Sequence, residues 1–124
     1  MDKIGFIGIG EIGTPIALRL LQAGYPMVVY DNRPHQVISL ESYAPEISDT
    51  PKHLAERCSV IFLALPTSKE VREVALSDDG IVHGAAPNTT IVDMTSGNPK
   101  DTISIAMRLK RKSIHMLDLS LIHI

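Results

Sequence analysis

Three glycines near the amino terminus are spaced in a way that suits the binding of an anion. Gly8, Gly10 and Gly13 form the pattern G-x-G-x-x-G between an apolar run and a segment with helical periodicity. There the first glycine permits a tight turn, the second lets a ligand approach the backbone, and the third allows close packing of strand and helix. Amides at the helix start then attract a pyrophosphate without any lysine. The residues expected to contact a dinucleotide are Gly8, Ile9, Gly10, Glu11, Ile12 and Gly13.

An acidic residue stands where the adenosine ribose of a dinucleotide is expected. Asp31 ends the next apolar run, at about the 20-residue separation typical of dinucleotide-binding domains. Its carboxylate can accept hydrogen bonds from the ribose hydroxyls and repels a 2′-phosphate, which favours NAD as the cofactor. Arg33 keeps NADP open, because a guanidinium binds phosphate well. We therefore expect Asp31, Asn32 and Arg33 to contact the cofactor, with NAD preferred and NADP possible.

Two segments rich in hydroxyl groups follow later apolar runs. Leu65-Pro66-Thr67-Ser68 comes after one run, and Asp93-Met94-Thr95-Ser96 comes after the next. The carboxyl ends of parallel strands form the edge where such sheets bind ligands. Each segment taken alone is explained equally well by helix capping. Their occurrence at the same edge favours a role in ligand binding.

The elements that must position these residues alternate along the chain. Apolar runs predict strands over 3–9, 26–31, 59–65, 90–94 and 114–118, with a short strand around Ile47. Helices are expected after residue 11, from Pro34, from Pro51 with Thr50 as its N-cap, after Thr67, and after Asn98. Gly24 stands where the first helix is expected to end. This order predicts an α/β fold, a doubly wound parallel sheet of the Rossmann type with helices on both faces, truncated in its last strands.

Composition narrows the function classes. The chain has 124 residues, 44% hydrophobic and 21% charged, which suits one globular domain. A net charge of −2 offers no positive field for nucleic acid, and no apolar run reaches the roughly 18 residues of a membrane span. We expect a cytoplasmic protein. Cys58 is expected to be buried, Tyr30 and Phe62 to belong to the sheet core, and the scattered histidines to bind no metal.

The same residues, read in order, resemble the β-hydroxyacid dehydrogenase family, which includes 3-hydroxyisobutyrate dehydrogenase and the cofactor domain of 6-phosphogluconate dehydrogenase. The resemblance covers nearly the whole chain. Its motifs are G-F-I-G-I-G-E-I-G-T-P from Gly5, A-x-x-L-L-x-A-G from Ala17, V-Y-D from Val29, L-P-T-S from Leu65, D-G-I from Asp79, D-M-T-S-x-x-P from Asp93, and Leu117-Asp118.

The resemblance implies roles for the later motifs. Leu65, Pro66 and Ser96 are expected at the nicotinamide half of the cofactor, and Thr95 and Ser96 near the substrate. The parent enzyme is expected to be a homo-oligomer that moves hydride between the cofactor and a small 3-hydroxy acid or semialdehyde. An NADPH-dependent glyoxylate or succinic semialdehyde reductase of the same family, and a non-catalytic nucleotide-binding module, remain as alternatives.

The end of the sequence departs from the family pattern. We expect residues 1–118 to form the dinucleotide-binding domain and residues 119–124 to be a foreign tail, because Leu-Ser-Leu-Ile-His-Ile resembles the in-frame translation of a transposon end used in sequencing libraries. A native end is the alternative. The family's helical domain and its catalytic lysine are expected to be absent, so no catalytic residue is assigned and this chain is expected to be inactive by itself.

Overall fold

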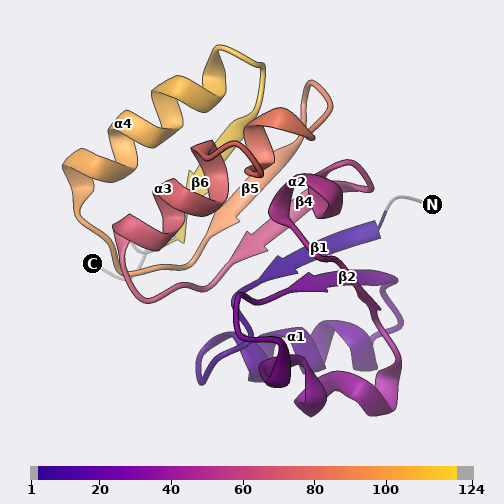
Figure 1. The fold of residues 1–124 in the computed structure, drawn as a ribbon. Helices are drawn as coiled ribbons and strands as arrows, with labels where there is room; N and C mark the ends of the chain where they lie inside the picture. Colours follow the sequence, from indigo (N-terminus) through magenta and orange to yellow (C-terminus); the bar gives the residue numbers. More distant parts are fainter. Residues whose placement is uncertain (1–2, 120–124) are drawn as a thin grey trace.

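The computed structural model describes residues 3–119, in which strands and helices alternate (Figure 1). The strands are β1 (Lys3–Ile7), β2 (Met27–Tyr30), β3 (Glu46–Ile47), β4 (Cys58–Leu63), β5 (Thr90–Asp93) and β6 (His115–Asp118). The α-helices are α1 (Gly13–Gln22), α2 (Pro51–Ala55), α3 (Ser68–Leu76) and α4 (Pro99–Lys110), and the 3-10 helices are η1 (Pro34–Tyr43) and η2 (Ile81–His83). These strands pair in parallel in the order β3-β2-β1-β4-β5-β6, which confirms the predicted fold class.

Helices cover both faces of the sheet because side chains alternate along each strand. Phe6 of β1 is buried in one cluster with Ala17 of α1 and Leu40 of η1. Its neighbour Ile7 is buried in the other cluster, with Leu54 of α2 and residues of α3 and α4. Figure 1 shows α1 on one side of β1 and β2, and α2, α3 and α4 on the other side of the sheet. The central strand is therefore enclosed on both faces, as its continuous apolar sequence predicts.

Two central strands end earlier than predicted, and this frees residues for the sheet edge. Strand β1 was expected to continue to Ile9 but ends at Ile7, because Gly8 turns the chain with φ of +98°. Strand β4 ends at Leu63 instead of residue 65. Ile9 and Leu65 therefore lie in loops at the carboxyl edge of the sheet, where their backbone amides are free to bond to other loops.

Three of the predicted helix starts, those of α2, α3 and α4, are confirmed by side-chain caps. Thr50 accepts a hydrogen bond from the His53 amide at 3.1 Å, with Pro51 in the first helical position. Thr67 accepts one from the Lys69 amide at 3.2 Å and donates its hydroxyl to Glu70. Asn98 caps α4 in the same way, through the amide of Lys100 at 2.9 Å. These caps satisfy amides that a helix leaves without an internal partner.

The end of α1 is fixed by a glycine, as predicted. Gly24 has φ of +91°, a left-handed conformation that glycine adopts without steric cost. Its amide donates to the Leu21 carbonyl at 3.0 Å, and the Tyr25 amide donates to the Leu20 carbonyl at 3.2 Å. This pair of bonds is the Schellman motif, which satisfies the last carbonyls of the helix and directs the chain into β2.

The segment after β2 differs from the short helix expected there. Residues Pro34–Tyr43 form a 3-10 helix, in which only Leu40 is fully buried. The segment thus lacks the continuous apolar stripe by which an α-helix packs against a sheet. The 3-10 helix η2 was not predicted. Cys58 is buried at the start of β4, as expected. Residues 120–124, which carry most of the predicted foreign tail, lie outside the described residues.

Candidate functional site

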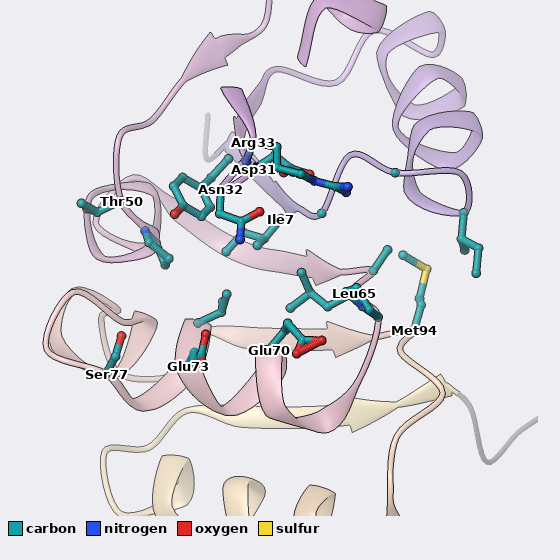
Figure 2. A pocket seen from close by; sticks show the side chains of 18 of the residues that line it. Ile7, Asp31, Asn32, Arg33, Thr50, Leu65, Glu70, Glu73, Ser77 and Met94 are labelled. Carbon is teal, nitrogen blue, oxygen red and sulfur yellow. Dashed lines mark hydrogen bonds and ion pairs between the residues drawn. The ribbon is translucent and has the colours of Figure 1, made fainter. Parts of the chain in front are cut away.

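A cavity of about 830 Å³ opens at the carboxyl edge of the sheet. Loops after β1, β2, β4 and β5 form its floor and one wall, and α3 forms the opposite wall. Figure 2 shows this arrangement, with Asn32, Arg33 and Thr50 on one side and, on the other, Glu70 and Glu73 of α3 and Ser77 just after it. The cavity lies between loops that are distant in sequence but adjacent in the strand order, which is where doubly wound sheets bind ligands.

The three motif glycines have the three different geometries that the sequence predicts. A Cβ atom on Gly8 would lie 2.2 Å from the carbonyl oxygen of Ala64, so the turn admits no side chain. A Cβ on Gly13 would lie 2.0 Å from the carbonyl oxygen of Gly8, so the third glycine lets α1 approach β1. A Cβ on Gly10 would meet no protein atom within 4 Å, and Gly10 lines the cavity. The second glycine thus leaves open the space that a pyrophosphate requires.

Asp31 ties the glycine loop to the loop after β2. Its Oδ2 accepts a hydrogen bond from the Ile9 amide at 2.8 Å, and its Oδ1 accepts one from the Arg33 amide at 2.8 Å. The guanidinium of Arg33 lies 3.7 Å from the same carboxylate. Only 5% of the Asp31 side chain is exposed, against 57% for Arg33. Sequence reasoning missed this tether, which makes Asp31 a structural part of the site as well as a candidate ribose acceptor.

The cavity wall is predominantly acidic. One guanidinium, that of Arg33, lines it together with the carboxylates of Glu11, Asp31, Asp49, Glu70, Glu73 and Asp79. A hydrogen bond with His53 lowers the pKa of Asp49, so this exposed carboxylate is ionised at neutral pH. Burial, followed by the charges of Asp31 and Asp79, raises the pKa of Tyr30, so its hydroxyl remains protonated as a potential donor.

The far end of the cavity is formed by the loops after β4 and β5. Leu65, Pro66 and Ser96 line it, and Met94 lies beside Leu65 in Figure 2. Thr95 is only 2% exposed, and its Oγ1 accepts a hydrogen bond from the Leu65 amide at 3.0 Å. Thr95 therefore lies behind the cavity wall. Of the two residues predicted near the substrate, only Ser96 lines the cavity and can contact a ligand directly.

Most of the residues predicted from sequence meet at this one cavity. The predicted residues that line it are Gly8, Gly10, Glu11, Ile12, Asp31, Asn32, Arg33, Leu65, Pro66 and Ser96. Three others do not line it: Ile9 is buried in the core and contributes its amide, Gly13 packs against Gly8, and Thr95 is covered. Contact of these residues with a cofactor is a prediction.

Sequence reasoning missed the wall formed by α3 and one residue of β2. Glu70, Glu73 and Val74 line the cavity from one side of α3, and Ser77, which ends the helix as its C-cap, continues this side. Their spacing of three, four and seven residues marks one face of a helix, a signal that is usable once the sheet edge beside the helix is known. Tyr30 was expected in the sheet core; it packs against the core and also lines the cavity.

Comparison with known proteins decides what this site belongs to. The family model described as the NAD binding domain of 6-phosphogluconate dehydrogenase matches residues 3–121. The chain belongs to this family. It is an NAD(P)-binding domain of the β-hydroxyacid dehydrogenase type of oxidoreductase, as the resemblance implied.

The NAD(P)-binding domain corresponds to part of longer relatives. A protein of Arabidopsis thaliana named probable 3-hydroxyisobutyrate dehydrogenase-like 3, mitochondrial, is 33% identical over 116 residues, which are 94% of this chain and 36% of the relative. The 3-sulfolactaldehyde reductase of Escherichia coli K12 is 29% identical over 95% of this chain and 40% of its own length. The chain thus spans about 36–40% of these relatives' lengths.

Solved structures show the same fold. The 3-hydroxyisobutyrate dehydrogenase of Mycobacterium tuberculosis superposes on the NAD(P)-binding domain with a TM-score of 0.85 at 21% identity, covering 95% of this chain and 40% of that one. An imine reductase from Myxococcus stipitatus in complex with NADP+ gives a TM-score of 0.84 at 20% identity, covering 94% and 39%. Within residues 3–119, no helix is long and apolar enough to cross a membrane.

Proposed function

We propose that the whole protein transfers hydride between NAD and a small 3-hydroxy acid or its semialdehyde, and that this chain holds the cofactor. The observation that carries the cofactor role is the open space in front of Gly10, which lines a cavity of about 830 Å³ just before the start of α1, where helix amides favour an anion. When bound, the nicotinamide supplies the hydride chemistry, and the protein supplies position and electrostatics.

The substrate class is supported by the relatives. Their names include 3-hydroxyisobutyrate dehydrogenase of Pseudomonas aeruginosa, 2-(hydroxymethyl)glutarate dehydrogenase of Eubacterium barkeri and 3-sulfolactaldehyde reductase of Escherichia coli. Each of these names refers to a small acid that carries a primary alcohol or an aldehyde. A glyoxylate or succinic semialdehyde reductase that uses NADPH is the second candidate, favoured only by the exposed guanidinium of Arg33 at the cavity rim.

The choice of NAD rests on charge. NADP carries an additional phosphate, and Asp31 lies where the ribose bearing that phosphate is expected. The surrounding wall adds carboxylates and a single guanidinium, which already has Asp31 as a neighbour at 3.7 Å. Placing a phosphate dianion among these groups costs free energy, because like charges repel strongly where water is partly excluded.

Replacement of Asp31 tests this preference. Asp31→Asn removes the charge and keeps one oxygen to accept an amide, so we expect the ratio of the NADP(H) to the NAD(H) dissociation constant to fall about tenfold, or 1.4 kcal/mol. Asp31→Ala removes both acceptors and releases the Ile9 amide, so it should weaken binding of both cofactors. Calorimetric titration of each variant with each cofactor measures this. If the wild-type chain already binds NADP(H) more tightly than NAD(H), Arg33 and not Asp31 determines the cofactor preference.

We also propose that this chain binds cofactor without turning it over. Oxidation of an alcohol needs a base within hydrogen-bond reach of the hydroxyl, a role that the family resemblance gives to a lysine. Among residues 3–119, no lysine lines the cavity, and Lys69 and Lys100 are exposed in the first turns of their helices. The absorbance of reduced cofactor, followed with NAD and 3-hydroxyisobutyrate, is expected to stay constant. Turnover of about 1–10³ per second would reveal a base within these residues.

The alternative of a non-catalytic nucleotide-binding module makes a different prediction for the gene. A dehydrogenase of this family continues into a helical domain with the pattern G-x-x-x-K, and reading the frame onward would show whether it is present. Restoring that segment should give turnover in a dehydrogenase, whereas a binding module would bind cofactor and remain inactive.

A further inference from the structure

The two loops at the far end of the cavity are joined to one another. The loop after β4 carries Leu65 and Pro66, and the loop after β5 carries Ser96. The dinucleotide's adenosine half is expected at Asp31 and its pyrophosphate at the start of α1, so its other half extends toward these two loops. The rigidity of these two loops should therefore affect the affinity of the chain for the nicotinamide half.

The first connection is made by Thr95. Its Oγ1 accepts a hydrogen bond from the Leu65 amide at 3.0 Å. Its amide donates to Oδ1 of Asp93 at 2.9 Å, and burial raises the pKa of that carboxyl. Both residues are only 2% exposed. Thr95 thus links the Leu65 backbone, through its hydroxyl, to a buried carboxylate, through its amide.

The second connection is made by Ser68, at the first residue of α3. Its Oγ accepts a hydrogen bond from the Asn98 amide at 2.7 Å. Ser68 is 8% exposed, and a Cβ on Gly97 would lie 2.3 Å from the same oxygen. The loop after β5 is therefore pressed against the start of α3 just beyond Ser96. The two bonds, Leu65–Thr95 and Asn98–Ser68, are here called the interloop bonds.

We propose that Thr95 and Ser68 are positioning residues that, through the interloop bonds, hold Leu65, Pro66 and Ser96 in the arrangement that receives the nicotinamide half of the cofactor. The interloop bonds enclose these three cavity residues, and each uses a buried hydroxyl that the cavity does not reach. Loops fixed before the ligand arrives lose less conformational entropy on binding, which raises affinity for the part of the ligand that they contact. This inference rests on the proposed cofactor role.

Comparison of two ligands isolates the effect. ADP-ribose contains the adenosine and pyrophosphate of NADH and lacks the nicotinamide. Thr95→Val keeps the shape of the side chain and removes the hydroxyl, so we expect the affinity of the chain for NADH to fall at least fivefold while its affinity for ADP-ribose changes less than twofold. Thr95→Ser restores the hydroxyl and should return the NADH affinity to within twofold of wild type. Calorimetry gives both dissociation constants on the same samples.

Two further variants keep the test decisive. Ser68→Ala breaks the second bond and should show the same selective loss, which covers the case in which Thr95→Val does not fold. Thr89→Val removes a buried hydroxyl just before β5, at the opposite end of that strand from Thr95, and breaks neither interloop bond, so the ratio of the two affinities should stay at the wild-type value. Equal losses for both ligands, or no loss for either, would overturn the positioning role. Failure of folded wild-type chain to bind ADP-ribose or NADH would instead overturn the proposed cofactor role and this inference with it.

Discussion

Gly10→Val is expected to lower the affinity of the chain for NAD(H) at least tenfold, or about 1.4 kcal/mol, while leaving the fold intact. The cavity is open in front of Gly10, since a Cβ there meets no protein atom within 4 Å. A valine side chain would occupy the space in which the pyrophosphate approaches the backbone amides. Because ADP-ribose carries the same pyrophosphate, its affinity should fall equally. Titration calorimetry with both ligands measures the two losses.

The stability of the same variant is its control. Since no neighbour has to move, the free energy of unfolding of Gly10→Val in urea should lie within about 0.5 kcal/mol of wild type, as for most exposed substitutions. Loss of binding with preserved stability locates the cofactor at this loop. If the variant folds normally and binds NAD(H) as well as wild type, the cofactor does not lie against Gly10 and the site is wrongly assigned.

Gly8→Ala should have the opposite result, a large loss of stability. Gly8 has φ of +98°, and the added Cβ would lie 2.2 Å from the carbonyl oxygen of Ala64 on the neighbouring chain segment. Backbone strain and overpacking each cost about 1–3 kcal/mol, so together we expect roughly 2–6 kcal/mol. Domains of this kind are stable by only about 5–15 kcal/mol. Urea unfolding followed by circular dichroism measures the loss.

Gly24 provides the matched comparison for Gly8. Its φ of +91° is nearly the same, but a Cβ there has no atom within 4 Å. Gly24→Ala therefore carries only the cost of the left-handed backbone, about 1–2 kcal/mol. The difference between the two alanine variants measures the steric contribution of the contact with Ala64. Equal destabilisation of both variants would mean that the tight approach of Gly8 to the loop after β4 is incorrect.

Much of the site could be predicted because its residues act through the backbone. The position of each glycine in G-x-G-x-x-G predicts its role: the first permits a tight turn, the second leaves space for a ligand, and the third allows close packing of helix and strand. Gly8, Gly10 and Gly13 have these geometries. The parallel sheet was predictable for a related reason, since buried strands read as continuous apolar runs. Asp31 was found by its separation from the motif. Its bond to the Ile9 amide was not, because the sequence does not show that β1 ends at Ile7.

Sequence reasoning could not place residues whose role depends on where a side chain points. Thr95 belongs to a hydroxyl cluster at the ligand edge, but it is buried in a turn in which its amide bonds to Asp93 and its hydroxyl accepts from the Leu65 amide. Glu73 and Ser77 have no motif and reach the cavity only because α3 lies across from Arg33, as Figure 2 shows. Such positions depend on tertiary packing, which no local pattern in one sequence encodes.

The strand order has a consequence for how the protein is made. Strand β1 lies at the centre of the sheet, between β2 and β4, and Phe6 is paired in register with Phe62. On a ribosome that adds about 5–20 residues per second, the partner strand is completed on the order of 3–11 s after β1. Until then the most buried strand of the native protein has a free edge and uncovered apolar side chains. We expect this edge to be open to mispairing until Leu63 has left the exit tunnel, and the sheet to be complete only after β6 has followed.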